Sequence, residues 1–298
     1  AYCLRTHVYG RLSETRKDLM KKFVSNLRRG LEEITLPVWT SFRKSAKPAP
    51  LSGKDGIVVS LTTFPARIGK LWIVMDSLFR QTVRPDKIVL VLSEEEFPER
   101  MNGIPDSLEA YIDAGLEIVF VPWNMRCHNK YLYSLQAFKD SIVVTVDDDC
   151  YYRKDTLGRL LELHSKYPDA VCCNIAAIID PLHFHEYSFW KKSERELPPG
   201  RLNLALGFAG VLYPSSMPQS FFNMDLARHL APTADDLWLK AVELAEGIPV
   251  ACGSFFPKPV TIKSAQKVSL RSLNKGSLNR NDLQWKALDE YFALEEKI

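Results

Sequence analysis

Cysteine is scarce in this sequence and shows no pairing pattern. The 298 residues contain six cysteines, and no two of them have the Cys-x-x-Cys spacing of a zinc or redox site. Cys172 and Cys173 are adjacent in a segment that we expect to form a strand, so their side chains should point to opposite faces. These features exclude a disulfide scaffold and favour reduced thiols used as small core residues, as in cytosolic proteins.

Long hydrophobic runs are also missing. The longest candidate, residues 170–179, is shorter than the roughly 18 apolar residues that a membrane span requires, and it contains Asn174. The first residues do not have the pattern of a signal peptide. We therefore expect a cytoplasmic protein, with at most a peripheral contact to the inner face of a membrane.

A strong charge of one sign is absent from most of the chain. The formal net charge is +3, but residues 1–47 contain 11 Lys or Arg and 4 Asp or Glu, whereas the remaining residues contain 28 and 32. The basic excess is thus confined to the N-terminal segment, where it lacks interleaved aromatic residues. For this reason we do not expect nucleic-acid binding.

The N-terminal segment has an organisation of its own. Residues 12–35 place apolar side chains at helical spacing with Lys and Arg between them, which predicts a basic amphipathic helix. Such a helix can lie on an anionic membrane, pack on a partner, or cover one side of the following domain. Residues 43–56 are rich in Pro, Ser, Gly and Lys, as in a linker. We therefore divide the chain into a basic extension, residues 1–50, and one domain, residues 51–298.

Short apolar runs alternate with amphipathic segments from Ile57 onward. Runs of β-branched residues without polar alternation indicate strands that are buried on both faces, and hence an α/β fold with a largely parallel sheet. After about residue 180 this rhythm breaks into a loop-rich insertion. The expected strands are 57–64, 87–93, 116–122, 141–147, 170–178 and 206–214, and the expected helices are 70–82, 107–115, 129–140, 154–169, 233–247 and 283–296.

Three consecutive carboxylates, those of Asp147, Asp148 and Asp149, follow the apolar run of the fourth strand. Adjacent carboxylates repel one another, and a turn needs at most one Asp. Ligands of parallel sheets bind beyond the carboxyl ends of the strands, and oxygen ligands suit Mg²⁺ or Mn²⁺. The pattern predicts a divalent-cation site that serves a diphosphate. The alternative is a solvated acidic turn that caps the next helix.

The order of the motifs resembles the GT-A-fold nucleotide-sugar glycosyltransferases over about residues 57–250. The resemblance is carried by "VVSLTTFPAR", "VDDDC", "GFAGVLYP" and "TADDLWL", in that order. The motifs resemble those of inverting, family-2-like members. Their residues also look like those of bacterial enzymes that build capsule or lipopolysaccharide. The resemblance implies a GT-A-like sheet with a nucleotide-binding half, residues 57–150, and an acceptor and catalytic half, residues 151–298.

The resemblance also implies roles for the acidic triplet and its neighbours. Asp147 would contact the ribose or the sugar and, together with Asp149, bind the metal, while Asp148 would assist or face the donor sugar. A family member often supplies a late His as a further ligand, but this sequence has no His after His229. Lys130, at a helix start on the same sheet edge, would reach the diphosphate.

Other residues would hold the donor. Thr62, Thr63 and Arg67 would sit against the nucleotide, although Pro65 already ends the strand there and leaves a purely structural role open for the threonines. The resemblance places the backbone of two glycines, Gly207 and Gly210, against the sugar. Both are also compatible with ordinary loop positions.

Asp235 and Asp236 carry the catalytic step in this comparison. In an inverting enzyme one carboxylate takes the proton of the acceptor hydroxyl as it attacks the anomeric carbon. We assign this base to Asp236, with Asp235 in support. The alternative is that both only favour the start of a helix for which Thr233 is the N-cap.

The insertion after residue 180 contains two histidines among aromatic residues. His183 and His185 would share one face of a strand, where they could bind a metal ion or an acceptor, or they belong to a loop. Tyr187, Phe189 and Trp190 could stack on an acceptor sugar or pack in the core.

The sequence therefore predicts a metal-dependent glycosyltransferase that uses Mn²⁺ or Mg²⁺. The expected donor is a nucleoside-diphosphate sugar, most commonly a UDP-sugar, and the expected acceptor is a glycan or a lipid-linked hydroxyl. One alternative is a sugar-1-phosphate nucleotidyltransferase, which needs a Gly-rich basic loop that "LTTFPARIGK" lacks. The other is a non-catalytic module, which is expected to lose carboxylates that are all present here.

Overall fold

The computed structural model describes residues 47–193, 195–253, 258–262 and 279–298, together with Leu27, Leu31, Thr35 and Leu36. Residues 46–298 form one compact unit, and residues 1–45 form another. The predicted basic helix of residues 12–35 and its membrane contact lie almost entirely outside the described residues. In the described part of the chain, no helix combines the length and the apolar character that crossing a membrane requires.

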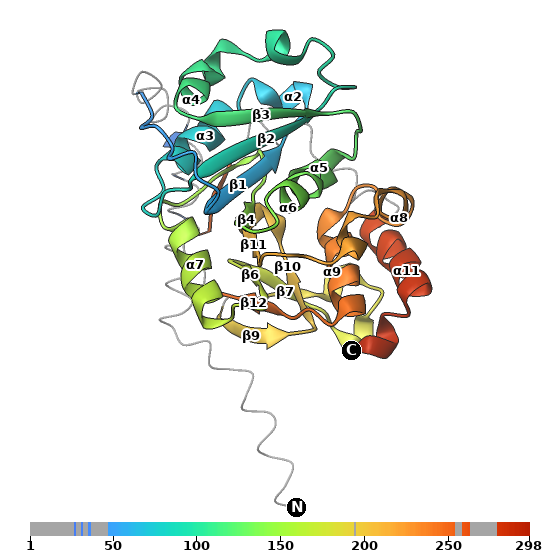
Figure 1. Cartoon of the computed structure of the whole chain (residues 1–298). Coiled ribbons are helices and arrows are strands. Elements are labelled where there is room, and N and C mark those ends of the chain that lie inside the picture. The colour runs from blue at the N-terminus through green and yellow to red at the C-terminus, as the bar shows by residue number, and fades with distance from the viewer. Residues whose placement is uncertain are drawn as a thin grey trace, which may run out of the picture. The chain divides into compact units, whose positions relative to one another are not determined.

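The larger unit is built on a central sheet of eight strands in the order β3-β2-β1-β4-β11-β6-β12-β9 (Figure 1). Two smaller sheets accompany it, with the orders β10-β7-β8 and β13-β5. The strands are β1 (Ile57–Thr62), β2 (Lys87–Ser93), β3 (Leu116–Val121), β4 (Ile142–Thr145), β5 (Cys150–Tyr151), β6 (Val171–Cys173), β7 (Ala176–Ile178), β8 (Lys191–Lys192), β9 (Leu197–Gly200), β10 (Asn203–Ala205), β11 (Val211–Tyr213), β12 (Val250–Cys252) and β13 (Val260–Thr261).

The first four strands of the central sheet are parallel, as their uninterrupted apolar runs predict. β11 lies between β4 and β6 and is antiparallel to both, and β9 is an antiparallel edge strand. The predicted strand at 87–93 coincides with β2, and the prediction of a mostly parallel α/β sheet is confirmed.

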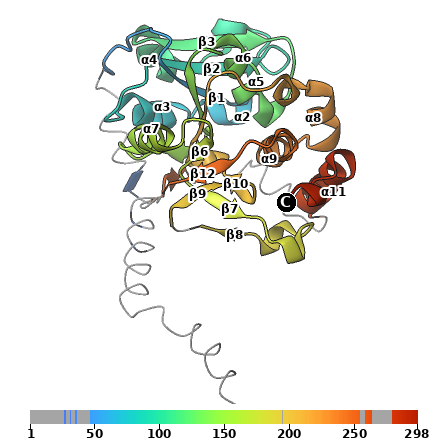
Figure 2. The ribbon, with the colours of Figure 1, turned by 60° about the horizontal axis from the view of Figure 1, so that its bottom comes forward.

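Helices cover both faces of this sheet. Figure 2 shows α3 and α7 on one side of the central strands and α9 on the other, with α11 packed outside α9. α5 packs against β1 and β2. The helices are α2 (Pro65–Ile68), α3 (Trp72–Phe79), α4 (Glu109–Asp113), α5 (Asn129–Leu132), α6 (Ser134–Ala137), α7 (Thr156–Lys166), α8 (Met224–Leu230), α9 (Asp235–Glu246) and α11 (Arg280–Phe292).

The predicted strand at 170–178 is in fact two strands. β6 ends at Cys173, and the Asn174 side chain donates a hydrogen bond of 3.0 Å to the carbonyl of Ala209. This buried amide is satisfied by the segment that precedes β11, so the chain leaves the central sheet and continues as β7 in the three-stranded sheet. The apolar run could not reveal the break, because both strands are apolar.

Thr233 is not the N-cap of α9, so that prediction is wrong. The N-cap is Ala234, whose side chain cannot bond the helix. The backbone N–H and the hydroxyl of Thr233 instead donate to Oε1 of Gln284 in α11, at 3.0 and 3.2 Å. A long-range partner therefore takes the hydroxyl that the local sequence assigned to helix capping.

Gly210 occupies a backbone position that other residues rarely adopt. Its φ is 91°, and an added Cβ would meet side chains of Leu160, Thr156 and Asn174 at 3.4 to 3.6 Å. We expect Gly210→Ala to lower the free energy of unfolding by about 1–3 kcal/mol, because the strain of a positive φ remains in the folded state. Urea unfolding measures the loss.

Gly69→Ala is the matched control for that substitution. Gly69 has a φ of −62°, and an added Cβ there meets nothing within 4 Å. Alanine should be neutral or slightly stabilising at this position. Equal losses from the two substitutions would contradict the backbone argument.

Candidate active site

The acidic triplet forms a tight turn between β4 and β5. The hydroxyl of the buried Tyr152 accepts a hydrogen bond from the N–H of Asp147 at 2.7 Å and donates to its carbonyl at 3.2 Å. The carbonyl of Asp149 accepts from the N–H of Ile262, beside β13, at 2.8 Å. The backbone of the triplet is therefore fixed at both ends, which makes the directions of its carboxylates reproducible.

The three carboxylates point to different partners. Asp147 accepts from Nζ of Lys130 at 2.6 Å, whereas Asp148 accepts from the hydroxyl of Thr63 at 2.6 Å and from Arg67. Asp149 lies 3.3 Å from the same Arg67 guanidinium. Their side chains are 31%, 7% and 16% exposed, respectively. The mutual repulsion of the triplet is thus offset by two cations, and an open acidic turn is excluded.

The segment after β1 supplies the partners of Asp148. Pro65 starts α2, which places Arg67 in the first turn of that helix and leaves Thr63 just ahead of it. Burial raises the pKa of Asp148 to about 6, although the nearby Arg67 opposes this shift. The hydroxyl of Thr62 donates to the carbonyl of Val91 in β2 at 2.7 Å, so Thr62 fastens β1 to its neighbour.

Lys130 connects the acidic turn to the start of α9. Its side chain is 5% exposed, and its Nζ lies 2.6 Å from Asp147 and 2.7 Å from Asp235. Burial by itself lowers the pKa of Lys130, but the carboxylates of Asp147 and Asp235 raise it by more, so the ammonium stays charged. Ser60 of β1 donates to the carbonyl of Lys130 at 2.6 Å and holds its backbone on the sheet.

Gly207 brings the segment before β11 into the same group. Its N–H donates to Oδ1 of Asp236 at 3.1 Å. A Cβ added to Gly207 would lie 2.9 Å from that oxygen, 2.9 Å from Nζ of Lys130 and 3.6 Å from Asp147. A side chain at this position would therefore have to displace the Asp236 carboxylate and the Lys130 ammonium.

The two carboxylates at the start of α9 differ in their environments. Burial alone would raise the pKa of Asp235, but the ion pair with Lys130 outweighs it and lowers that pKa. Burial and the negative charge of Asp235 raise the pKa of Asp236 well above its ordinary value. Adjacent carboxylates with opposite shifts are suited to different chemical roles, one as a fixed charge and the other as a proton acceptor.

The structure thus brings together most of the residues singled out in the sequence. One group is Lys130 with Asp147, Asp235, Asp236 and Gly207, and the adjoining group is Arg67 with Thr63, Asp148 and Asp149. Two residues stay outside: the hydroxyl of Thr62 faces β2, and Gly210 faces α7 and Asn174.

Comparison with known proteins agrees with this arrangement. The family model "Glycosyl transferase family 2" matches residues 67–213, which include the acidic turn and Gly207. Residues 67–213 are therefore similar to glycosyl transferase family 2. The resemblance to the GT-A-fold nucleotide-sugar glycosyltransferases is thereby confirmed, and the chain is a glycosyltransferase. No curated protein matches it by sequence.

Several solved structures are similar to this glycosyltransferase at low identity. The mannosyltransferase PcManGT from Pyrobaculum calidifontis is 13% identical over 91% of this chain and 81% of that chain, with a TM-score of 0.41. The glucosyl-3-phosphoglycerate synthase from Mycobacterium tuberculosis is 18% identical, over 40% of this chain and 43% of that one, with a TM-score of 0.31. TarS 1–349 from S. aureus is 12% identical over 80% and 72%, with a TM-score of 0.44. Similarity at this level says nothing of the donor or acceptor here.

Sequence reasoning missed several residues that position the site of the glycosyltransferase. His128 Nε2 donates to the carbonyl of Ala231 at 2.8 Å, and its Nδ1 accepts from the hydroxyl of Tyr131 at 2.9 Å. Burial lowers the pKa of His128, so the ring is neutral and joins the start of α5 to the segment before α9. Its place two residues before Lys130 was the only sequence signal, and it does not identify a partner 103 positions away.

The histidines of the insertion are not on a strand, so of the two alternatives the loop holds. His183 ends a 3-10 helix (Pro181–His183), and its ring stacks on Phe189 with centroids 4.0 Å apart. Trp190 is buried against Trp285 of α11 and donates to the carbonyl of His183, so it is a core residue.

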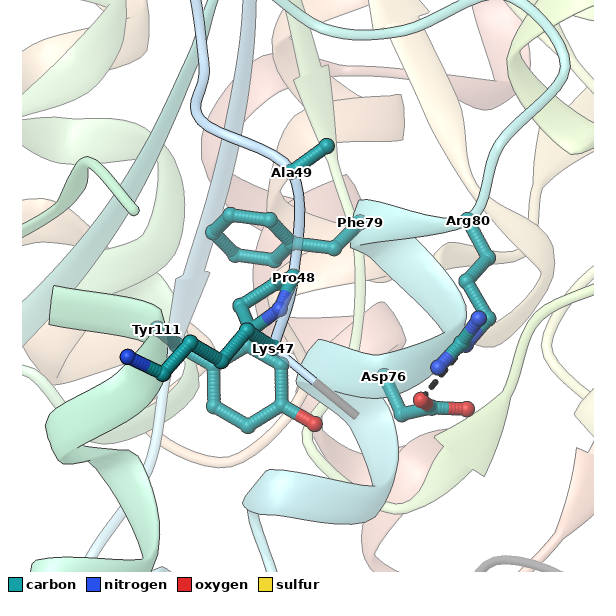
Figure 3. A pocket seen from close by; sticks show the side chains of 7 residues that line it. All are labelled: Lys47, Pro48, Ala49, Asp76, Phe79, Arg80 and Tyr111. Atoms are coloured by element: carbon teal, nitrogen blue, oxygen red, sulfur yellow. Dashed lines mark hydrogen bonds and ion pairs between the residues drawn. The ribbon is translucent and has the colours of Figure 1, made fainter. Parts of the chain in front are cut away.

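A hollow of about 210 Å³ lies elsewhere in the unit, at the C-terminal half of α3 (Figure 3). Phe79 and Tyr111 form its aromatic wall, the ion pair of Asp76 with Arg80 lies on its other side, and the segment 47–49 crosses it. None of the predicted site residues lines this hollow. It is therefore distinct from the group around Lys130.

Proposed function

We propose that this glycosyltransferase moves a sugar from a nucleoside-diphosphate sugar to a hydroxyl of a glycan or lipid-linked acceptor. The reaction uses a divalent cation, Mn²⁺ or Mg²⁺, and inverts the anomeric carbon. The observation that carries the proposal is the buried Lys130 ammonium, which pairs with Asp147 of the strand-end turn and with Asp235 of α9. The Lys130 side chain thereby links a carboxylate proposed to lie near the diphosphate with the carboxylates proposed to lie near the acceptor hydroxyl.

The side chains present fit a hard divalent cation. Among the described residues, the two adjoining groups contain five carboxylates and two cations, and carboxylate oxygens are the ligands that Mg²⁺ and Mn²⁺ prefer. Asp148 is committed to Thr63 and Arg67, so we assign the cation to Asp149 and Asp147. When bound, it supplies positive charge that neutralises the diphosphate.

The nucleotide is assigned to the carboxyl ends of β1 and β4. These strands are parallel neighbours, and ligands of such sheets bind beyond their carboxyl ends. Thr63 and Arg67 follow β1, and the acidic turn follows β4. We propose a uridine diphosphate sugar, with Arg67 and Lys130 as the cations nearest the diphosphate.

Asp236 is the proposed general base. Its neighbour Asp235 is held ionised by Lys130, and the N–H of Gly207 orients Oδ1 of Asp236. A half-buried carboxylate with a raised pKa can accept the proton of a sugar hydroxyl near neutral pH. The acceptor oxygen loses its proton to Asp236 as it attacks the anomeric carbon from the face opposite the diphosphate. The bond between that carbon and the diphosphate oxygen breaks, and the nucleoside diphosphate leaves, which gives inversion.

The acceptor follows from two further expectations. The motif sequences, which resemble those of bacterial capsule and lipopolysaccharide enzymes, support a glycan of that type as the acceptor. The predicted basic helix of residues 12–35 would bring the enzyme to an anionic membrane surface, where a lipid-linked acceptor is reached. The nucleotidyltransferase alternative is not favoured, since α2 begins at Pro65, where that class needs a glycine-rich loop.

Asp149→Asn tests the cation assignment. The change removes one charged ligand, so we expect the affinity for a UDP-sugar in the presence of Mn²⁺ to fall at least about 100-fold. Without Mn²⁺, the variant and the parent protein should bind the donor equally. Isothermal titration with and without the cation measures both values.

Asp113→Asn, at the exposed end of α4, is the matched control and should leave donor binding unchanged. If Asp149→Asn binds the donor with undiminished Mn²⁺ dependence, the assignment of the cation to the triplet is wrong. A screen of several nucleotide sugars under the same conditions identifies the base and the sugar.

A further inference from the structure

We propose a second metal site in this chain, separate from the diphosphate site and formed by His185, Asp289 and Glu295, which takes a Zn²⁺-type transition-metal dication. Its ligands come from the insertion after β7, from the last turns of α11 and from the 3-10 helix Glu295–Lys297 that ends the chain. The sequence alone showed no partner for His185; the fold supplies two.

The ligand atoms of the three residues are already gathered. One nitrogen or oxygen from each of them lies within 4.8 Å of the other two. His185 Nε2 lies 2.8 Å from Oδ2 of Asp289, and Oδ1 of Asp289 accepts the backbone N–H of Glu295 at 2.9 Å. Because a backbone bond orients the Asp289 carboxylate, its second oxygen is held toward the histidine, as in metal sites with ordered outer contacts.

Each ligand is anchored by the buried residue that precedes it in the chain. Phe184, Leu288 and Leu294 are 3%, 0% and 0% exposed. The ring of Phe184 contacts Trp285 of α11, with centroids 5.4 Å apart. The three side chains therefore project from fixed backbone positions, which distinguishes this group from an accidental gathering of surface carboxylates.

The chain reverses its direction after α11 and brings Glu295 back over Asp289. Ala293 has a left-handed φ of 49°, and its N–H donates to the carbonyl of Asp289 at 2.7 Å. Leu294 is then fully buried, and Glu295 follows it at the surface. A non-glycine residue in the left-handed region costs free energy, so the reversal is maintained by the packing of Leu294.

The charge of the group is uncompensated by protein cations. Within the described residues, no Lys or Arg forms an ion pair with Asp289 or Glu295, and His185 is the only basic partner of Asp289. Two carboxylates and one imidazole therefore leave an excess of negative charge. A dication would neutralise it.

The ligand types select the metal. Imidazole nitrogen with two carboxylate oxygens suits Zn²⁺, Co²⁺ or similar ions, whereas Mg²⁺ and Ca²⁺ prefer all-oxygen sets. Three protein ligands leave one tetrahedral position for water, since the His185 and Glu295 side chains reach the surface. The ion would link the insertion to α11, where Tyr187 and Trp190 already contact Asp282 and Trp285.

The test uses the full chain and Zn²⁺ or Co²⁺ as the probe. Because an ion that binds only the folded state raises the melting temperature, Zn²⁺ should stabilise the parent protein. His185→Ala should weaken Zn²⁺ binding at least tenfold, and Co²⁺ should give visible absorption bands of a tetrahedral site that this variant lacks. His183→Ala is the matched control, because its side chain is 38% exposed against 39% for His185.

Asp149→Asn separates this site from the proposed diphosphate site. That variant should keep the Zn²⁺ stabilisation and the Co²⁺ spectrum. If it loses them while His185→Ala keeps them, the ion belongs to the acidic turn and the second site does not exist. Equal Zn²⁺ affinity of the parent protein and His185→Ala also overturns the proposal, and Glu295→Gln, at an exposed position, repeats the test without removing the bond between His185 and Asp289.

Discussion

Replacing Asp236 with Asn should lower kcat for sugar transfer by about 10²–10⁴-fold while donor binding is retained. The amide still accepts the N–H of Gly207 but cannot take a proton from the acceptor hydroxyl. The raised pKa of Asp236 adds a pH signature. Since the base acts when deprotonated, the rate should rise with pH, through a pKa above the ordinary range for Asp. Initial rates across pH and donor titration measure the two quantities separately.

Two variants control this experiment. Asp225→Asn removes a carboxylate from the first turn of α8 and should leave transfer unchanged. Asp235→Asn removes the fixed partner of Lys130 and should disturb both donor binding and rate. Full transfer activity of Asp236→Asn would overturn the assignment of the base, and loss of transfer with intact donor binding in Asp235→Asn alone would give that role to Asp235.

Lys130→Met should lower the free energy of unfolding by about 3–5 kcal/mol at pH 7, because it leaves buried carboxylates without their shared cation. The raised pKa of Lys130 means that its contribution is fully present at neutral pH and is lost only as pH rises through that pKa. In the acid range the carboxylates become protonated. The difference between the parent protein and the variant should therefore shrink as pH falls.

Urea unfolding at several pH values measures this difference. Lys139→Met, at an exposed position after α6, is the matched control and should change stability by less than about 0.5 kcal/mol. A constant deficit of the Lys130 variant from neutral to acid pH would contradict the electrostatic explanation and leave only a packing effect.

Local pattern predicted the parts of the fold that local sequence determines. β2 coincides with its apolar run, and the acidic turn lies where the fourth run ends, because strand burial and turn chemistry act over a few residues. The same reasoning failed where a residue distant in sequence determines the local structure. The Thr233 hydroxyl donates a hydrogen bond to α11 instead of capping α9. Asn174 ends β6 through a hydrogen bond to the carbonyl of Ala209.

The candidate site divides in the same way. The sequence identified its carboxylates, because adjacent acidic residues at a strand end and a helix start are unusual without a positive partner. It could not show that Lys130 pairs with both motifs, or that Thr62 uses its hydroxyl to hold β2. These contacts span up to about a hundred residues and follow from the order of the strands, which no local pattern encodes.

The antiparallel direction of β11 has a consequence for how the candidate site is assembled. Val211 lies opposite Thr145, so the residues leading into β11 run beside the residues leading out of β4. Gly207 reaches the acidic turn only after this strand has inserted between β4 and β6. A chain synthesised only through the acidic turn after β4 contains Thr63, Arg67, Lys130 and the triplet, but it lacks Gly207, Asp235 and Asp236. The proposed transfer therefore depends on residues that are made only after β6.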